Sequence, residues 1–160
     1  MSPAEEAVLP YVVAGVFLGF PLFWTGIVWL VGQFGWKRLA EGFEATSDPP
    51  LSSRRIRWGT LALLKSPLRK ANYGGCINAW LSETGLWLRP MLVFRINHPM
   101  LHLPWARIQG IREERILGFR RVRVTLGNGM PDLLLAGRLA QAVLESGERA
   151  GKSRAAAPRS

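Results

Sequence analysis

The longest uncharged stretch of this 160-residue chain runs from Ala7 to Trp36 and reads AVLPYVVAGVFLGFPLFWTGIVWLVGQFGW. An α-helix rises about 1.5 Å per residue, so about 20 residues cross the ~30 Å hydrocarbon core of a bilayer. These 30 residues suffice for one tilted crossing but not for two crossings and a turn. We therefore predict one transmembrane helix over residues 9–34, in which Pro21 is a tolerated kink.

The residues that flank this stretch indicate an anchor and not a cleaved leader. A signal peptide has a basic start and a shorter apolar core, whereas Glu5 and Glu6 precede this stretch and Lys37 and Arg38 follow it. A buried helix of a soluble protein is the other alternative, but such helices seldom run so long without a charge. Aromatic residues suited to headgroup depth lie near the two ends, at Tyr11, Trp29 and Trp36.

The charge distribution predicts an orientation. All 21 Lys and Arg residues follow position 36, while two of the 11 acidic residues precede the stretch, so the net charge of +10 divides into −2 before it and +12 after it. The positive-inside rule then places residues 1–8 outside as a short external tail and the bulk of the chain in the cytoplasm. The single cysteine, Cys76, excludes a disulfide framework and agrees with a reducing compartment.

Residues 35–53 read as a connector between the membrane and a separate domain. Apolar residues at positions 36, 39, 40 and 43 have the spacing of one helical face, which predicts a short amphipathic helix. That helix either lies at the cytoplasmic interface or packs against the domain that follows. Pro49 and Pro50, among polar neighbours, then predict a linker over residues 46–53.

Residues 54–147 have the pattern of a mainly-β domain. Short apolar or alternating runs occur at 57–64, 75–81, 86–89, 101–105, 107–115, 119–126 and 131–136. A tight turn is expected at residues 83–85 and a hairpin turn at Gly127–Gly129. Apolar residues from Leu139 to Leu144 then follow a helical period that ends near Gly147, and residues 148–160 have the composition of a disordered basic tail. We predict a small barrel of six to seven antiparallel strands capped by a C-terminal helix.

Four short motifs in this domain follow one another in a distinctive order: Tyr73-Gly74-Gly75, Glu83-x-Gly85-Leu86, Phe94-Arg95-x-x-His98-Pro99 and Leu103-Pro104-Trp105-x-x-Ile108. In this order they resemble small bacterial single-pass membrane proteins with a cytoplasmic pleckstrin-homology-like (GRAM-like) domain. The resemblance covers residues 54–147 and implies a binding role without a catalytic residue. It also implies the bacterial cytoplasmic (inner) membrane as the location.

Basic residues are the main candidate binding groups. In pleckstrin-homology-like folds the loop between the first two strands commonly meets lipid phosphates, and the resemblance places Lys65, Arg69 and Lys70 in that loop, here residues 65–72. Arg54 and Arg55 follow the linker directly. Each basic residue near an anionic leaflet contributes about 1 kcal/mol, so the alternatives are specific headgroup binding and a general attraction from positive-inside bias.

Tryptophans are the candidate protein-interaction residues. Trp80, Trp87 and Trp105 exceed what a core of this size requires, and exposed tryptophan often marks an interface. The alternative is that all three are core residues.

Candidates for catalysis or metal binding are few. His98 and His102 have a helical ligand spacing, but Pro99 and Pro104 argue against a helix there, so we expect His98 to cap a loop and His102 to face solvent. Cys76 begins an apolar run in which a buried, inert thiol is usual. Glu113 and Glu114 alternate faces on a strand, with Arg112 and Arg115 as expected charge partners. We predict a non-enzyme without catalytic residues, cofactor or metal.

Three functions remain open from the sequence. The leading hypothesis is a membrane-anchored module that contacts a protein partner, anionic inner-leaflet lipid, or both. The second is an accessory subunit of a larger membrane complex. Gly15 and Gly19 have the G-x-x-x-G spacing that would equally permit a homodimer. The third is a nucleic-acid binder that uses the arginine-rich hairpin and tail, which the anchor makes the least favoured of the three.

Overall fold

A computed structural model describes residues 3–33, 35–66 and 69–156 of the chain. Its helices and strands, in order, are α1 (Pro3–Gln33), α2 (Trp36–Phe43), β1 (Arg54–Ser66), β2 (Arg69–Leu81), β3 (Gly85–Pro90), β4 (Leu101–Pro104), β5 (Gly110–Ile116), β6 (Phe119–Thr125), β7 (Asp132–Ala136) and α3 (Gly137–Ala156). Two short 3-10 helices, η1 (Leu92–Phe94) and η2 (Trp105–Arg107), lie on either side of β4. The seven strands and the C-terminal helix occupy the region that the sequence pattern assigned to the β-domain.

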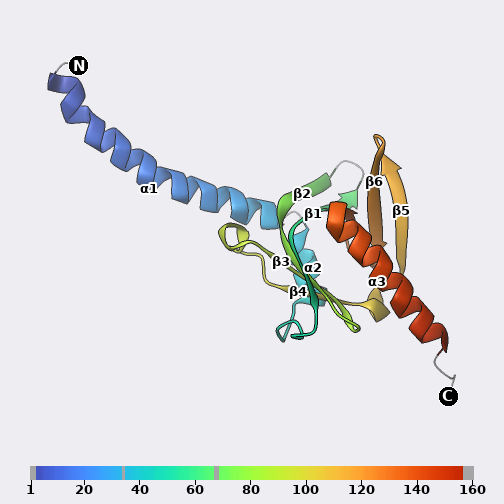
Figure 1. Cartoon of the computed structure of the whole chain (residues 1–160). Coiled ribbons are helices and arrows are strands. Elements are labelled where there is room, and N and C mark those ends of the chain that lie inside the picture. The colour runs from blue at the N-terminus through green and yellow to red at the C-terminus, as the bar shows by residue number, and fades with distance from the viewer. Residues whose placement is uncertain (1–2, 34, 67–68, 157–160) are drawn as a thin grey trace.

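α1 projects away from the β-domain as one long helix (Figure 1). Its segment Pro10–Leu30 has 21 residues with a mean hydropathy of 1.9, and only 6% of the apolar window is buried. The core helix of a soluble protein would be mostly buried, so this helix is long, apolar and exposed enough to cross a membrane. Pro10 and Pro21 both lie inside the continuous helix. Residues 3–8, expected as a short tail, are part of α1.

The seven strands form one antiparallel sheet in the order β4-β3-β2-β1-β7-β6-β5. β1 and β2 are its longest strands, with 13 residues each, and they make a hairpin at its centre. The sheet curls, but its outer strands β4 and β5 do not pair with each other within the described residues. The expectation of six to seven antiparallel strands is confirmed, while the closed barrel is corrected to an open half-barrel.

The core of the domain combines α2, the sheet and α3. Leu61 and Leu63 of β1 are fully buried, and Ala62 between them turns to the other face and is only half-buried, as the period of two requires. α2 contributes three buried residues, Trp36, Leu39 and Phe43, and α3 contributes Leu139, Ala140 and Val143. The predicted amphipathic helix is therefore present, and its apolar face packs against the domain.

The C-terminal helix is longer than the sequence pattern predicts. α3 continues to Ala156, so the disordered tail expected from residue 148 is wrong for residues 148–156. Alanine, arginine, glutamate and lysine are strong helix formers, and Ala150 packs against the core. Gly147, read as the end of the helix, instead lets the Ile111 side chain of β5 approach closely. Residues 157–160 lie outside the described residues.

Gly85, the first residue of β3, generates a stability prediction. A Cβ at this position would lie 2.5 Å from the carbonyl oxygen of Leu103 and 2.9 Å from Cα of Pro104, both in the backbone of β4. Gly85→Ala should therefore lower the free energy of unfolding by about 1–3 kcal/mol, because the two strands must separate. Thermal and chemical unfolding of the full chain in detergent, followed by circular dichroism, measures the loss.

Gly110 provides the matched control for Gly85. It also begins a strand, β5, but no atom lies within 4 Å of its hypothetical Cβ. Gly110→Ala should change the free energy of unfolding by less than about 0.5 kcal/mol. Equal effects of the two substitutions would contradict the proposed crowding between β3 and β4.

Candidate membrane-facing site

The last turns of α1 pack against the domain instead of ending free. Val28 is only 3% exposed, and the ring of Trp24 lies 5.5 Å from the ring of Phe94 in η1. A small apolar cavity of about 110 Å³ lies between α1, β2 and the β3–β4 loop, lined by Trp24, Ile27, Val28, Asn72, Tyr73, Cys76, Phe94 and His98. The helix that could cross a membrane therefore shares an interface with the sheet.

Trp36 holds this junction together at the start of α2. Its side chain is fully buried, and its indole Nε1 donates a 2.9 Å hydrogen bond to the carbonyl oxygen of Pro99. Its ring packs 5.3 Å from Tyr73 and 5.5 Å from His98, measured between centroids. Trp36 was expected to be an interfacial anchor, and its place in the core corrects that expectation. Trp29, one of the other two aromatic residues named as anchors, remains half exposed on α1.

Tyr73 and His98 form a buried polar pair beside Trp36. The His98 Nδ1 lies 2.7 Å from the carbonyl oxygen of Ile96, and a carbonyl only accepts, so Nδ1 carries the proton. Nε2 then accepts a 3.0 Å hydrogen bond from the Tyr73 hydroxyl. Burial lowers the pKa of His98 and raises the pKa of the Tyr73 hydroxyl, so both side chains are neutral. The expected loop-capping role of His98 is therefore only part of its role, because the ring is a core residue.

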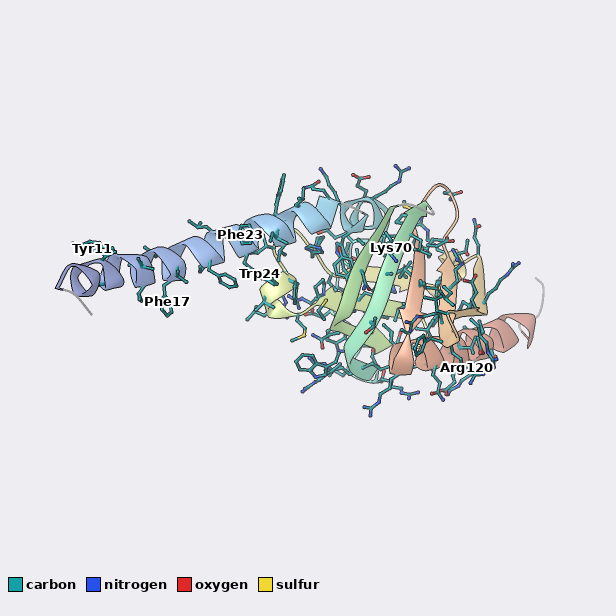
Figure 2. All side chains as sticks on the ribbon, turned by 90° about the horizontal axis from the view of Figure 1, so that it is seen from above. Tyr11, Phe17, Phe23, Trp24, Lys70 and Arg120 are labelled. Atoms are coloured by element: carbon teal, nitrogen blue, oxygen red, sulfur yellow. The ribbon has the colours of Figure 1, made fainter. Side chains whose placement is uncertain are left out.

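The β1–β2 connection is much shorter than the expected loop of residues 65–72. β1 continues to Ser66 and β2 begins at Arg69, which places Lys65, Arg69 and Lys70 at strand ends. The side chains of Lys65 and Arg69 lie outside the described part of the structure. Lys70 is exposed on the same face of β2 as Asn72, which lines the cavity beside Trp24. Lys70 therefore lies on the hairpin two residues along β2 from a residue that borders α1 (Figure 2).

Arg54 and Arg55 lie at the opposite end of the same hairpin. Arg54 pairs with Leu81 and Lys70 pairs with Leu64, so ten residues of β1 separate the two ends, about 30 Å of strand. Arg54 forms a 3.2 Å ion pair with Glu145 of α3, and the Arg55 guanidinium lies 5.1 Å from the centroid of the Trp80 ring. The structure therefore separates Arg54 and Arg55 from the end of the hairpin that carries Lys65, Arg69 and Lys70.

The tryptophans expected at an interface are mainly structural. Trp87 is buried and stacks on His102 with centroids 3.8 Å apart, so His102 does not simply face solvent. Trp105 is buried and donates its indole N–H to the carbonyl oxygen of Ser82 at 2.9 Å. Trp80 is half-buried under Arg55. Among these positions, only Trp80 retains a surface for a partner.

Sequence reasoning missed a different exposed tryptophan, Trp58. It is 67% exposed and has a positive φ of 62°, at a place where the register of β1 and β2 shifts. An extra residue at such a bulge turns side chains away from the strict alternation of a strand. The sequence contains no signal for the exposure of Trp58, because a bulge in a strand of apolar residues does not alter a visible alternation of polar and apolar positions.

The tip of the β5–β6 hairpin is a second surface that the sequence analysis left out. Leu117 is 92% exposed and Phe119 is 66% exposed, directly before Arg120 and Arg121. The signal for this apolar tip was present as Leu117 and Gly118 between two charged runs. Exposed apolar residues at a turn are candidates for contact with another molecule.

The two glutamates of β5 find charge partners across the sheet. Glu113 binds Arg120 at 2.6 Å, and Glu114 binds Arg123 at 2.6 and 3.0 Å. Arg123 also reaches Asp132 at 3.3 Å. The expectation that Arg112 and Arg115 are the partners is wrong, because each glutamate instead reaches the arginine diagonal to it on β6, two positions from the residue directly opposite.

Little in this part of the structure supports redox, nucleophilic or metal chemistry. Cys76 is buried, and burial raises the pKa of its thiol, which disfavours the reactive thiolate. Within the described residues, no group of three or more His, Cys, Asp or Glu side chains is placed to hold a metal ion.

A comparison with protein-family models and with curated proteins finds no match to this chain. The resemblance to membrane proteins with a pleckstrin-homology-like domain therefore rests on the motif residues alone. The geometry of the α1–sheet junction and of the exposed surfaces must carry the functional argument.

The buried His98 predicts a pH dependence of stability. Because burial lowers its pKa below the ordinary 6.5, the unfolded chain takes up a proton first as the pH falls below about 6.5. The free energy of unfolding of the full chain in detergent should therefore decrease below this pH. His98→Gln should remove most of that slope, measured by chemical unfolding at several pH values.

His102 is the control for this titration. Burial also lowers its pKa, but the ring is only half-buried, so His102→Gln should remove less of the slope than His98→Gln. A slope that survives in the His98 variant would show that another group causes the acid sensitivity.

Proposed function

We propose that this chain is a single-pass membrane protein whose β-domain is a non-catalytic binding module held against anionic lipid at the cytoplasmic face of the bacterial inner membrane. The observation that carries the proposal is the junction of α1 with the domain. The exposed apolar helix packs on the domain through Val28, and α2 begins at Trp36, soon after α1 ends at Gln33. A domain attached in this way has a fixed orientation to α1 and is not free on a tether.

Charge supports the orientation and the lipid contact. The net charge of +12 after position 36 favours a cytoplasmic domain, with the N-terminus outside. Lys70 lies two residues along β2 from Asn72, which borders α1, so headgroups would be within reach, and each such residue contributes about 1 kcal/mol near an anionic leaflet. Arg54 and Arg55, at the far end of the hairpin, are not placed to share this role.

The fold supports a pleckstrin-homology-like (GRAM-like) assignment as part of the proposal. A curled antiparallel sheet of seven strands followed by a C-terminal helix is the arrangement that this resemblance implies. The described site has a buried, neutral Tyr73–His98 pair and a protonated Cys76 thiol, which are structural groups. We accordingly propose a role in binding and not in catalysis.

A protein partner is the second candidate, and the β5–β6 hairpin favours it. Exposed Leu117 and Phe119 lie at the hairpin tip, and a groove of about 510 Å³ between this hairpin and α3 is lined in part by Glu113, Arg120 and Leu144. Apolar groups rimmed by charge are typical of protein interfaces. This surface would serve an accessory subunit equally well.

Association through α1 is a related possibility. No atom lies within 4 Å of a hypothetical Cβ at Gly15 or Gly19, so this face of α1 is open to a second helix. Small residues spaced four apart permit close helix packing in lipid. The second helix would belong to another copy of this chain or to a larger complex.

The lipid contact predicts a charge-dependent protection of the β1–β2 connection. Full chain in nanodiscs that contain anionic lipid should show slower amide hydrogen exchange at residues 64–72 than in zwitterionic nanodiscs, at low salt. Lys70→Glu should weaken the protection, since it removes about 1 kcal/mol of attraction and adds repulsion. Exchange followed by mass spectrometry measures the difference.

Arg55→Glu is the matched control, because it makes the same charge change at the distant end of the hairpin. Its protection pattern at residues 64–72 should equal that of the unmodified chain. Exchange rates that do not depend on lipid charge would contradict the lipid contact. Equal losses of protection in both variants would show that only the net charge of the chain matters. Release of the full chain from membranes by alkaline carbonate would contradict the anchor itself.

A further inference from the structure

The loop between β3 and β4 exposes apolar side chains beside α1. Leu92 is 73% exposed, Val93 is 56% exposed and Ile96 is 43% exposed. Both views show the loop lying along the C-terminal part of α1, and in Figure 2 its η1 turn lies next to the labelled Trp24 (Figures 1 and 2). The Phe94 ring, on the same turn, contacts the Trp24 ring. The apolar surface of α1 therefore continues onto this loop.

The depth of Trp24 in a membrane is constrained by the charges that precede α1's apolar segment. A span that begins before Ala7 would draw Glu5 or Glu6 into the lipid, and about 20 residues counted from Ala7 end at Gly26, beyond Trp24. In the segment Pro10–Leu30, Trp24 lies six residues inside the end, about 9 Å along the helix axis. Every placement of the span thus puts Trp24 inside the hydrocarbon region or at its edge, and Phe94 with it.

The backbone of the loop is suited to such a place because it satisfies much of its own hydrogen bonding. The amides of Phe94, Arg95 and His98 donate to the carbonyl oxygens of Met91, Leu92 and Arg95, at 2.9, 3.2 and 3.0 Å. His98 Nδ1 covers the carbonyl oxygen of Ile96. Unsatisfied backbone groups are costly in lipid, so an irregular loop enters the membrane only where its backbone groups have hydrogen-bond partners in the protein.

We propose that the β3–β4 loop, Met91–Ile96, inserts into the same leaflet as the C-terminal half of α1 and forms a second membrane contact. Its occupant is the boundary of headgroups and acyl chains, where Leu92 and Val93 meet lipid. Arg95 follows directly on the same loop, and long basic side chains beside an inserted segment reach toward headgroup phosphates. The inference rests on the proposed membrane anchor.

Two contacts constrain the domain more than one does. A helix alone sets the distance of the domain from the bilayer but leaves rotation about its own axis free. The inserted loop would lie to one side of α1, so it would fix that rotation and select which face of the sheet meets the headgroups. Lys70 lies two residues along β2 from Asn72, which lines the same cavity as Phe94 of this loop.

Fluorescence quenching by lipids tests the depth of the loop in the full chain. Cys76→Ala removes the only native thiol, and Val93→Cys then introduces one for an environment-sensitive NBD label. The same label at Val16→Cys reports the middle of α1, and at Leu51→Cys it reports the exposed linker. Each labelled chain is reconstituted in phosphatidylcholine–phosphatidylglycerol vesicles that carry nitroxide quenchers in the headgroup or on the acyl chain. Circular dichroism of each variant checks the fold.

The label at residue 93 should emit at shorter wavelength than the label at residue 51 and should lose at least half of its intensity to quenchers in the headgroup or high on the acyl chain. This corresponds to insertion of about 5–10 Å. The label at residue 16 should be quenched most by the deepest nitroxides.

Each other outcome overturns a distinct part of the proposal. Quenching at residue 16 without quenching at residue 93 overturns loop insertion and leaves the anchor intact. A blue shift at residue 93 without quenching assigns the loop to a second copy of the chain, which also overturns the inference. Absence of quenching at residue 16 overturns the anchor, and the inserted loop with it.

Discussion

The burial of Trp36 is the interaction on which the arrangement of this protein depends. Its side chain, directly after the buried Gly35, packs on β2 through Tyr73 and on the β3–β4 loop through His98 and the Pro99 carbonyl oxygen. A buried indole is shielded from water and held in one orientation by its neighbours, so the backbone on either side of it is fixed as well. The packing of the β-domain around Trp36 therefore determines the direction of α1.

The distribution of charge follows from that fixed direction. Strand geometry places Lys70 and Arg54 at opposite ends of one long hairpin. Basic residues that are close in the sequence are therefore far apart in the structure. Arg54, Arg120 and Arg123 are partly neutralised by glutamates of α3 and β5. Such exposed pairs add little stability, but they concentrate the remaining positive field on fewer residues.

Periodicity and turn chemistry predicted most of the fold. The uncharged run predicted α1, the spacing of Trp36, Leu39 and Phe43 predicted α2, and alternating residues predicted the seven strands. The candidate site was predicted less well, because it depends on which strand ends meet and on which face each tryptophan turns. The burial of Trp87 and the separation of Lys70 from Arg54 depend on register and bulges, which composition does not encode. The prediction of a disordered tail, where α3 continues, failed for another reason. Alanine and arginine are common both in helices and in disordered tails.

The open half-barrel has a consequence for molecules confined to one membrane. Anchored copies share a plane and an orientation, which aligns their free strand edges for pairing into larger sheets. β4 has only four residues, and its edge meets Glu44 directly after α2. β5 carries Arg112, Glu113, Glu114 and Arg115 in succession. These charges disfavour the pairing of an apolar strand with its free edge. The charges along this free edge thus disfavour pairing of β5 with the same edge of a second copy.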